Sequence, residues 1–152
     1  MKKNYGYGRI IKILKPSIHR IDPICSVYKQ CGGCQLQHMD SHEQNAFKEN
    51  KVKDCFHKIA GMDVEIQPII KVEPHWNYRN KVQIPVQYND SKVEMGFYAP
   101  HSNRIVQYDV CHVQTDLSNE LTNYFRKQFD MLACGKDMRH LLIKHAHNTG
   151  EV

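Results

Sequence analysis

Three cysteines within ten residues constrain this chain more than any other feature of its sequence. Cys25, Cys31 and Cys34 form the pattern C-x5-C-G-G-C, a density of thiols that a hydrophobic core does not require. Gly32 and Gly33 allow the backbone to turn back with its N–H groups directed at sulfur, so the thiolates can converge on one soft metal centre. The spacing therefore predicts a metal-binding loop with three local ligands.

A fourth ligand must come from a distant part of the chain, and three cysteines remain as candidates. Cys55 lies in an expected helix, where a cysteine is usually a small buried hydrophobic residue, and Cys134 lies at the end of another. Neither has a base partner at a spacing that indicates a nucleophile. Cys111 follows an expected strand and opens a short connection, so we choose it as the fourth ligand.

Three neighbouring cysteines and one distant cysteine suit a 4Fe-4S cluster. A structural zinc ribbon usually has two C-x-x-C pairs, whereas this chain has only the pair at 31–34. The remaining alternatives are that two of these cysteines form a disulfide or that all of them are inert thiols. His38 and His112 lie within four residues of them and are either hydrogen-bonding neighbours of the centre or ordinary loop histidines.

The C-G-G-C spacing favours a reducing compartment, where thiolates stay available for metal. The sequence has no run of eighteen apolar residues and no apolar segment typical of a secretion signal at its N-terminus. We therefore expect a cytoplasmic protein that does not associate with membranes, and a monomer.

The net charge of +5 is concentrated in the first twenty residues. That segment has six basic residues and no acidic one, whereas the other 15 basic and 16 acidic residues sum to −1. Tyr5 and Tyr7 add stacking faces, so this arm is able to bind a polyanion such as RNA. A merely solvated basic segment is the alternative.

Residues 8–14 are rich in β-branched side chains and predict a strand. One strand cannot form a sheet, so we expect the remnant of a small β domain. A capping box from Asp40 to Glu43 then predicts a helix over about 41–60, which Gly61 ends.

Alternating apolar residues predict five further strands, at 64–72, 78–88, 93–98, 104–110 and 141–145. The second and third form a hairpin through an Asn89-Asp90-Ser91 turn, and Pro85 should face an unpaired edge or a bulge. Helical spacing from Thr115 or Asp116 to Gly135 predicts a second helix, and Glu151-Val152 should begin a hairpin partner for the last strand. This order predicts an α+β fold with a mostly antiparallel sheet, two main helices and a cysteine-rich metal loop, as a fragment of a larger multidomain protein.

Several motifs follow one another along the chain: C-x5-C-G-G-C-Q-x-Q-H from Cys25, N-Y-R-N-K-V-Q-I-P-V from Asn77, G-F-Y from Gly96, R-I-V-x4-C-H-V-Q from Arg104, and finally R-H-L-L-I-K and T-G-E-V. Together they resemble the iron-sulfur RNA (uracil-C5)-methyltransferases. In that family a TRAM β-barrel, a cluster loop, a central α+β domain and a Rossmann-like methyltransferase domain succeed one another. The resemblance implies a TRAM-like remnant at 1–20, the cluster loop at 21–40 and a truncated central domain at 41–152.

The resemblance also implies the site residues. The family's cluster ligands fall on four cysteines: Cys25, Cys31, Cys34 and Cys111. A central-domain segment near the RNA path falls on four consecutive residues, Tyr78, Arg79, Asn80 and Lys81, and the nearby Trp76 is added to these predicted RNA contacts for its stacking face. Their chemistry agrees, because aromatic rings stack on bases and cations contact phosphates. On the alternative interpretation this is an amphipathic strand with Tyr78 and Val82 in the core and Arg79 and Lys81 solvated.

The parent that the resemblance implies is an S-adenosylmethionine-dependent rRNA or tRNA uracil-C5 methyltransferase. Its chemistry requires a thiolate, a methyl donor and a base, which the family keeps in its carboxy-terminal domain. This sequence has no glycine-rich strand-to-helix turn for that cofactor and no D-P-P-R or C-N-P motif. We therefore expect no catalytic or cofactor-binding residue in the chain, and no activity from it alone. The competing hypotheses are a non-enzymatic, metal-stabilised RNA-binding module and, less favoured by the basic arm, an electron-transfer protein.

Overall fold

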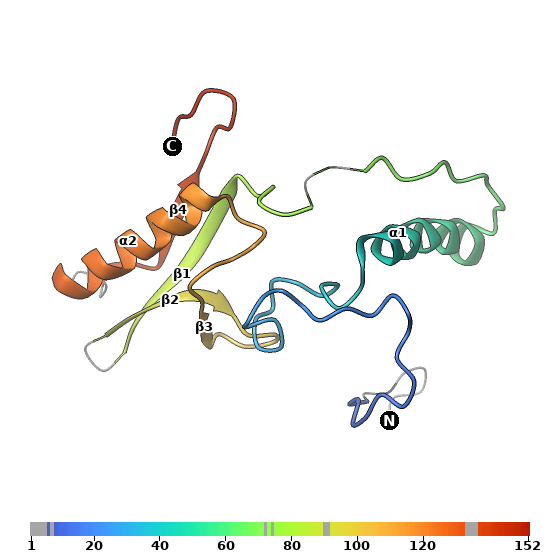
Figure 1. Ribbon diagram of the computed structural model, residues 1–152, viewed down its shortest axis with the longest axis horizontal. Helices are drawn as coiled ribbons and strands as arrows, with labels where there is room; N and C mark the ends of the chain where they lie inside the picture. The colour runs from blue at the N-terminus through green and yellow to red at the C-terminus, as the bar shows by residue number, and fades with distance from the viewer. Residues whose placement is uncertain (1–5, 7, 72, 74, 90–91, 133–136) are drawn as a thin grey trace.

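A four-stranded antiparallel sheet with a helix on one face is the centre of the fold (Figure 1). A computed structural model describes residues 6, 8–71, 73, 75–89, 92–132 and 137–152. The strands are β1 (Lys81–Asn89), β2 (Lys92–Tyr98), β3 (Ile105–Gln107) and β4 (His140–Lys144), in the spatial order β3-β2-β1-β4. The helices are α1 (Ser41–Cys55), continued by a π-helical turn η1 (Phe56–Ala60), and α2 (Asp116–Leu132). The predicted α+β class is confirmed.

The core lies between the sheet and α2. Because side chains alternate across a strand, Val82, Ile84 and Val86 of β1 share one face, and all three are buried. They pack with Met95 of β2 and Phe129 of α2 in the same cluster. Ile84 and Met95 have no exposed surface. The sheet is therefore fixed by its central hairpin and by one helix face.

Pro85 lies in a central strand and not in an edge strand, but its missing N–H faces a side of β1 that is unpaired at this position, as expected. The pairing changes partner at this residue: β1 pairs with β4 up to Pro85↔His140 and with β2 from Val86↔Met95. The Val86 N–H donates to Arg139 O (2.9 Å) on the β4 side, so the missing N–H of Pro85 faces β2. The proline is tolerated because the pairing with β2 stops before it.

Two predicted strands do not form. Residues 8–14 and 64–71 have no strand structure, and Val72 lies outside the described residues. Ile10, Ile11 and Ile70 are 79%, 90% and 92% exposed. β-Branched composition does not make a strand unless another strand pairs with it, and these segments have no such partner in the described structure.

The helix predicted over 41–60 is present, with the expected ends. Asp40 is its N-cap and accepts a hydrogen bond from Glu43 N (2.8 Å), while Gly61 ends η1 in the left-handed conformation (φ 65°). The helix buries no residue, and Figure 1 shows it apart from the sheet. Cys55 is exposed, which corrects the expectation of a buried helical cysteine.

The second helix begins as predicted. Thr115 Oγ1 accepts a hydrogen bond from Ser118 N (3.2 Å) and caps α2. The predicted end at Gly135, Cys134 and the turn residues Asp90 and Ser91 lie outside the described residues. After β4, Ala146 N donates to Glu151 O (2.8 Å), which closes a turn at the start of the expected hairpin, although 151–152 are not a strand. No helix in the described part of the chain is long and apolar enough to span a bilayer.

Candidate metal centre

The cysteine loop is closed at its base by a short antiparallel pairing. Arg20 forms a bridge with Met39, Ile21 N donates to His38 O (3.1 Å), and Asp40 N donates to His19 O (3.0 Å). The ends of the loop are thereby held together directly before α1 begins. All three local cysteines lie between these ends, so the pairing confines them to a small region.

Inside the loop, polar contacts set the positions of the thiols. Gly33 N donates to Cys31 Sγ (3.3 Å), which confirms the expectation that a glycine N–H points at sulfur. Cys25 N donates to Gln37 Oε1 (3.3 Å), and Gln37 is buried. The Tyr28 hydroxyl donates to Gln35 O (2.6 Å) and lies 2.7 Å from His38 Nδ1. These glutamines belong to the Q-x-Q-H part of the first motif, whose structural role the sequence did not reveal.

The loop docks on the connection that follows β2. Gly32 N donates to Tyr98 O (2.9 Å). A Cβ atom on Gly32 would lie 3.0 Å from Tyr98 O and 3.3 Å from the backbone nitrogen of Pro100. A side chain would therefore push the loop away from the sheet, and this close approach explains one glycine of the C-G-G-C pattern.

Cys111 is held by α2. Its N–H donates to Asn119 Oδ1 (2.9 Å), and Asn119 Nδ2 donates back to Cys111 O (3.2 Å). Asn119 is buried, and Gln114 N also donates to Cys111 O (3.0 Å). No sequence signal pointed to Asn119, because an asparagine in a helix is ordinary unless its distant partner is known.

The four cysteines chosen from the sequence line one cavity. Cys25, Cys31 and Cys34 come from the loop, and Cys111 comes from the connection between β3 and α2. The rest of the lining is largely apolar or aromatic, with one arginine: Val27, Tyr28, Gly33, Gln37, Arg79, Phe97, Tyr108, Val110, His112 and Val113. The chain thus gathers four thiols from segments far apart in sequence around a common space.

The cysteine sulfurs are not gathered as closely as the ligands of a single zinc ion. In tetrahedral zinc sites the Zn–S distance of about 2.3 Å places the sulfurs roughly 3.8 Å apart. Within the described residues, the one group whose metal-ligating atoms all lie within 4.8 Å of one another is formed by His19, Asp40 and His42, and the cysteines are not part of it. Four thiols around a cavity, rather than in contact, are compatible with a polynuclear cluster.

Two of the four thiols, Cys31 and Cys111, have a raised pKa. Burial raises the pKa of Cys31 and Cys111, and negative charge on Cys25 and Cys34 raises both further. Hydrogen bonds from the backbone of Val113 and Gln114 lower the pKa of Cys111, but less than burial raises it. A metal centre would supply the positive charge that thiolates need in this cavity.

The five predicted RNA contacts divide into two groups. Arg79 is half-buried, lines the cysteine cavity and is fixed by its N–H, which donates to Val113 O (2.8 Å). Trp76 is half-buried, and its ring forms a T-shaped pair with the ring of His112 (centroids 6.1 Å apart). Tyr78, Asn80 and Lys81 are exposed, and Asn80 O accepts from His145 N (2.7 Å). Tyr78 is 57% exposed, so the alternative is wrong for this residue, whereas Val82 is buried and Lys81 is exposed, as the alternative expected.

The two histidines near the cysteines differ in position. His112 lines the cavity and its carbonyl oxygen accepts from Asn77 N (2.9 Å). His38 does not line the cavity. Its Nδ1 contacts the hydroxyl of Tyr28, and it is Tyr28 that lines the cavity. Only His112 is therefore placed to contact a bound centre directly.

No family model matches this sequence. Over its whole length the chain is 36% identical to a protein of Clostridium tetani and 38% identical to one of Clostridium acetobutylicum, each named an uncharacterized RNA methyltransferase. A protein of the same description from Oceanobacillus iheyensis is 36% identical. The chain spans 35% of the length of each of these relatives. The whole chain is therefore similar to a segment that makes up about a third of the length of each of these relatives, which are named RNA methyltransferases.

Proposed function

We propose that this chain is the cluster-bearing, RNA-binding part of an S-adenosylmethionine-dependent methyltransferase that acts on C5 of uracil in rRNA or tRNA. The observation that carries the proposal is the convergence of four cysteines on one cavity, in a chain whose relatives are named RNA methyltransferases. In this proposal residues 1–20 belong to a TRAM-like domain, 21–40 form the cluster loop and 41–152 belong to a central domain.

The centre is a 4Fe-4S cluster with Cys25, Cys31, Cys34 and Cys111 as its ligands, and its role is structural. It joins Cys34 to Cys111, which are 77 positions apart (111 − 34), and so fastens the loop to the connection between β3 and α2. A crosslink over such a distance restricts the unfolded chain and stabilises the folded one. Arg79, which lines the same cavity, supplies positive charge beside the thiolates.

The proposed RNA surface lies next to the cavity. Tyr78 and Lys81 are exposed, and in the sequence they flank Arg79, which lines the cavity. An exposed ring stacks on a base and an exposed ammonium neutralises a phosphate. The cluster would therefore position the segment that contacts RNA. The cofactor and the catalytic groups belong to the rest of the longer protein.

Alanine at Tyr78 and at Lys81 should weaken RNA binding by the iron-loaded chain. Loss of a stacked base costs about 1–3 kcal/mol, or roughly 5- to 150-fold in affinity. Loss of one phosphate contact should lower the slope of log K against log salt by about 1. Both variants should keep their iron, because neither side chain lines the cavity. Fluorescence anisotropy with a labelled uridine-containing stem-loop, over a series of salt concentrations, measures both effects.

Lys51→Ala is the matched control for this experiment, since Lys51 is an exposed lysine on α1. It should bind RNA like the unmodified chain. Equal affinities for Lys51→Ala, Lys81→Ala and the unmodified chain would contradict the proposed surface, as would a complete lack of RNA binding at low salt.

The uracil assignment has its own test. A protein that joins this chain to its catalytic domain should transfer a labelled methyl group from S-adenosylmethionine to C5 of uridine, whereas the chain alone should transfer none. Label on another base would contradict the assignment. If the chain binds RNA but the joined protein transfers no methyl group to any base, the non-enzymatic RNA-binding module is the correct interpretation.

A further inference from the structure

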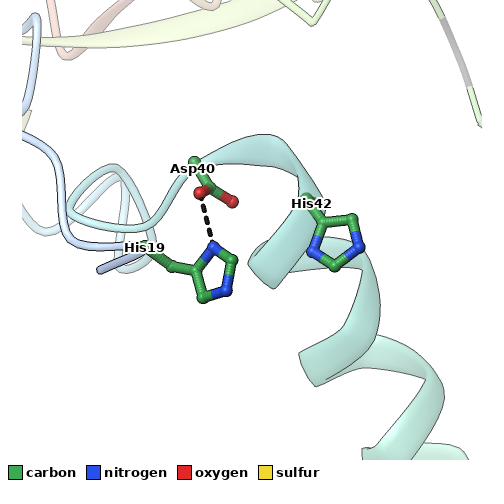
Figure 2. A group of neighbouring side chains, drawn as sticks. All are labelled: His19, Asp40 and His42. Carbon is green, nitrogen blue, oxygen red and sulfur yellow. Dashed lines mark hydrogen bonds and ion pairs between the residues drawn. The ribbon is translucent and has the colours of Figure 1, made fainter. Parts of the chain in front are cut away.

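Outside the cysteine cavity, one group of side chains has the composition of a metal site. His19 lies before the cysteine loop, whereas Asp40 and His42 lie at the start of α1. One potential ligand atom from each of the three lies within 4.8 Å of the others. Figure 2 shows the two imidazoles next to each other beside the carboxylate. Two imidazoles and a carboxylate are typical ligands of zinc and related divalent ions.

Asp40 fixes the orientation of one imidazole. Its Oδ2 lies 2.8 Å from His19 Nδ1, while its Oδ1 accepts the capping hydrogen bond from Glu43 N (2.8 Å). When Nδ1 of a histidine donates to a carboxylate, Nε2 is left with its lone pair free for a metal. The carboxylate also keeps lone pairs of its own, since each oxygen has two.

A simple ion pair between His19 and Asp40 does not explain the position of His42. The rings of His19 and His42 are stacked, with centroids 5.6 Å apart and an angle of 22° between their planes. One metal ion bound by a ring nitrogen of each imidazole would account for the proximity of the two rings, and the negative charges of Asp40 and Glu43 favour a cation there.

We propose that His19, Asp40 and His42 form a second metal site, which binds a divalent ion of the zinc type and clamps the base of the cysteine loop. The site joins the two segments that already pair through Arg20 and Met39. The side chains of His19 and Asp40 are each 34% exposed and His42 is exposed, so water has access to the remaining coordination position. The ion would hold the loop ends together whether or not the cysteine centre is occupied.

Zinc titration of the complete chain, without a histidine tag, tests this site. By calorimetry the unmodified chain should bind one more zinc ion per chain than His42→Gln does. His57→Gln is the matched control, because His57 also pairs with a carboxylate (Asp63, 2.7 Å) but has no third ligand beside it among the described residues. The cysteines are identical in all three proteins, so any zinc that they bind cancels from the comparison. Asp40→Asn keeps an N-cap residue and should weaken the extra site about 10- to 100-fold.

A second measurement needs no substitution. In the unmodified chain, zinc should shift the ring resonances of His19 and His42 and leave those of His57 in place. Equal zinc stoichiometry in the unmodified chain, His42→Gln and His57→Gln, or zinc shifts confined to other histidines, would overturn the proposal. The iron content of His42→Gln should equal that of the unmodified chain, so failure here is distinguishable from failure of the iron-cluster proposal.

Discussion

Replacing Cys111 by serine is expected to remove nearly all iron from the chain. Three cysteines of one loop cannot complete a four-thiolate cluster, and Cys111 is the cysteine that another segment brings to the same cavity. Asn119 and Gln114 would still fix the backbone of residue 111, so the substitution removes a ligand without removing its support. The measurement is iron and acid-labile sulfide per chain after anaerobic reconstitution.

Cys55→Ser is the control for this substitution. Cys55 is exposed at the end of α1 and does not line the cavity, so its variant should keep the full iron content. Full iron in Cys111→Ser would show that the fourth ligand is another residue, and loss of iron from Cys55→Ser would assign that role to Cys55.

Gly96→Ala is expected to destabilise the fold strongly. A Cβ atom at this position would lie 2.1 Å from Val106 O and 2.6 Å from Val106 C, both backbone atoms of β3. Gly96 pairs with Gln107, so β3 cannot move away without losing its pairing with β2. Overpacking alone costs about 1–3 kcal/mol, and the broken pairing adds to it, so we expect a loss of about 3 kcal/mol in the free energy of unfolding.

Urea denaturation followed by the fluorescence of Trp76 measures this loss. Gly8→Ala is the matched control, because a Cβ on Gly8 meets nothing within 4 Å, and its unfolding free energy should stay within about 0.5 kcal/mol of the unmodified chain. Since β3 leads directly to Cys111, Gly96→Ala should also reduce iron retention. A Gly96→Ala variant as stable as Gly8→Ala would contradict the close approach of β2 and β3.

Local signals in the sequence were sufficient for the helices and the hairpin. Asp40 and Thr115 mark the helix starts, because each accepts a hydrogen bond from the residue three positions later. In β1 and β2, alternate residues such as Val82, Ile84 and Val86 are buried on one face. The segments 8–14 and 64–71 show where such signals fail. Their composition is typical of strands, but a strand requires a partner, and pairing is a property of the whole fold.

The candidate site was predictable only in its residue types. The spacing of Cys25, Cys31 and Cys34 indicated a common centre, and Cys111 does lie at the same cavity, although its role as a ligand stays a prediction. The contacts that hold the site in place were not predictable. Asn119 hydrogen-bonds to the backbone of Cys111, eight residues earlier, and Gly32 hydrogen-bonds to the backbone of the distant Tyr98. Such contacts leave no local pattern.

Metal analysis of the anaerobically purified chain tests the central claim most directly. The four-cysteine centre predicts about four iron atoms and four sulfides per chain, with a broad absorption near roughly 400 nm from thiolate-ligated iron. Absence of iron, together with one zinc ion per chain that persists in His42→Gln, would contradict it and assign the cysteines to a zinc site.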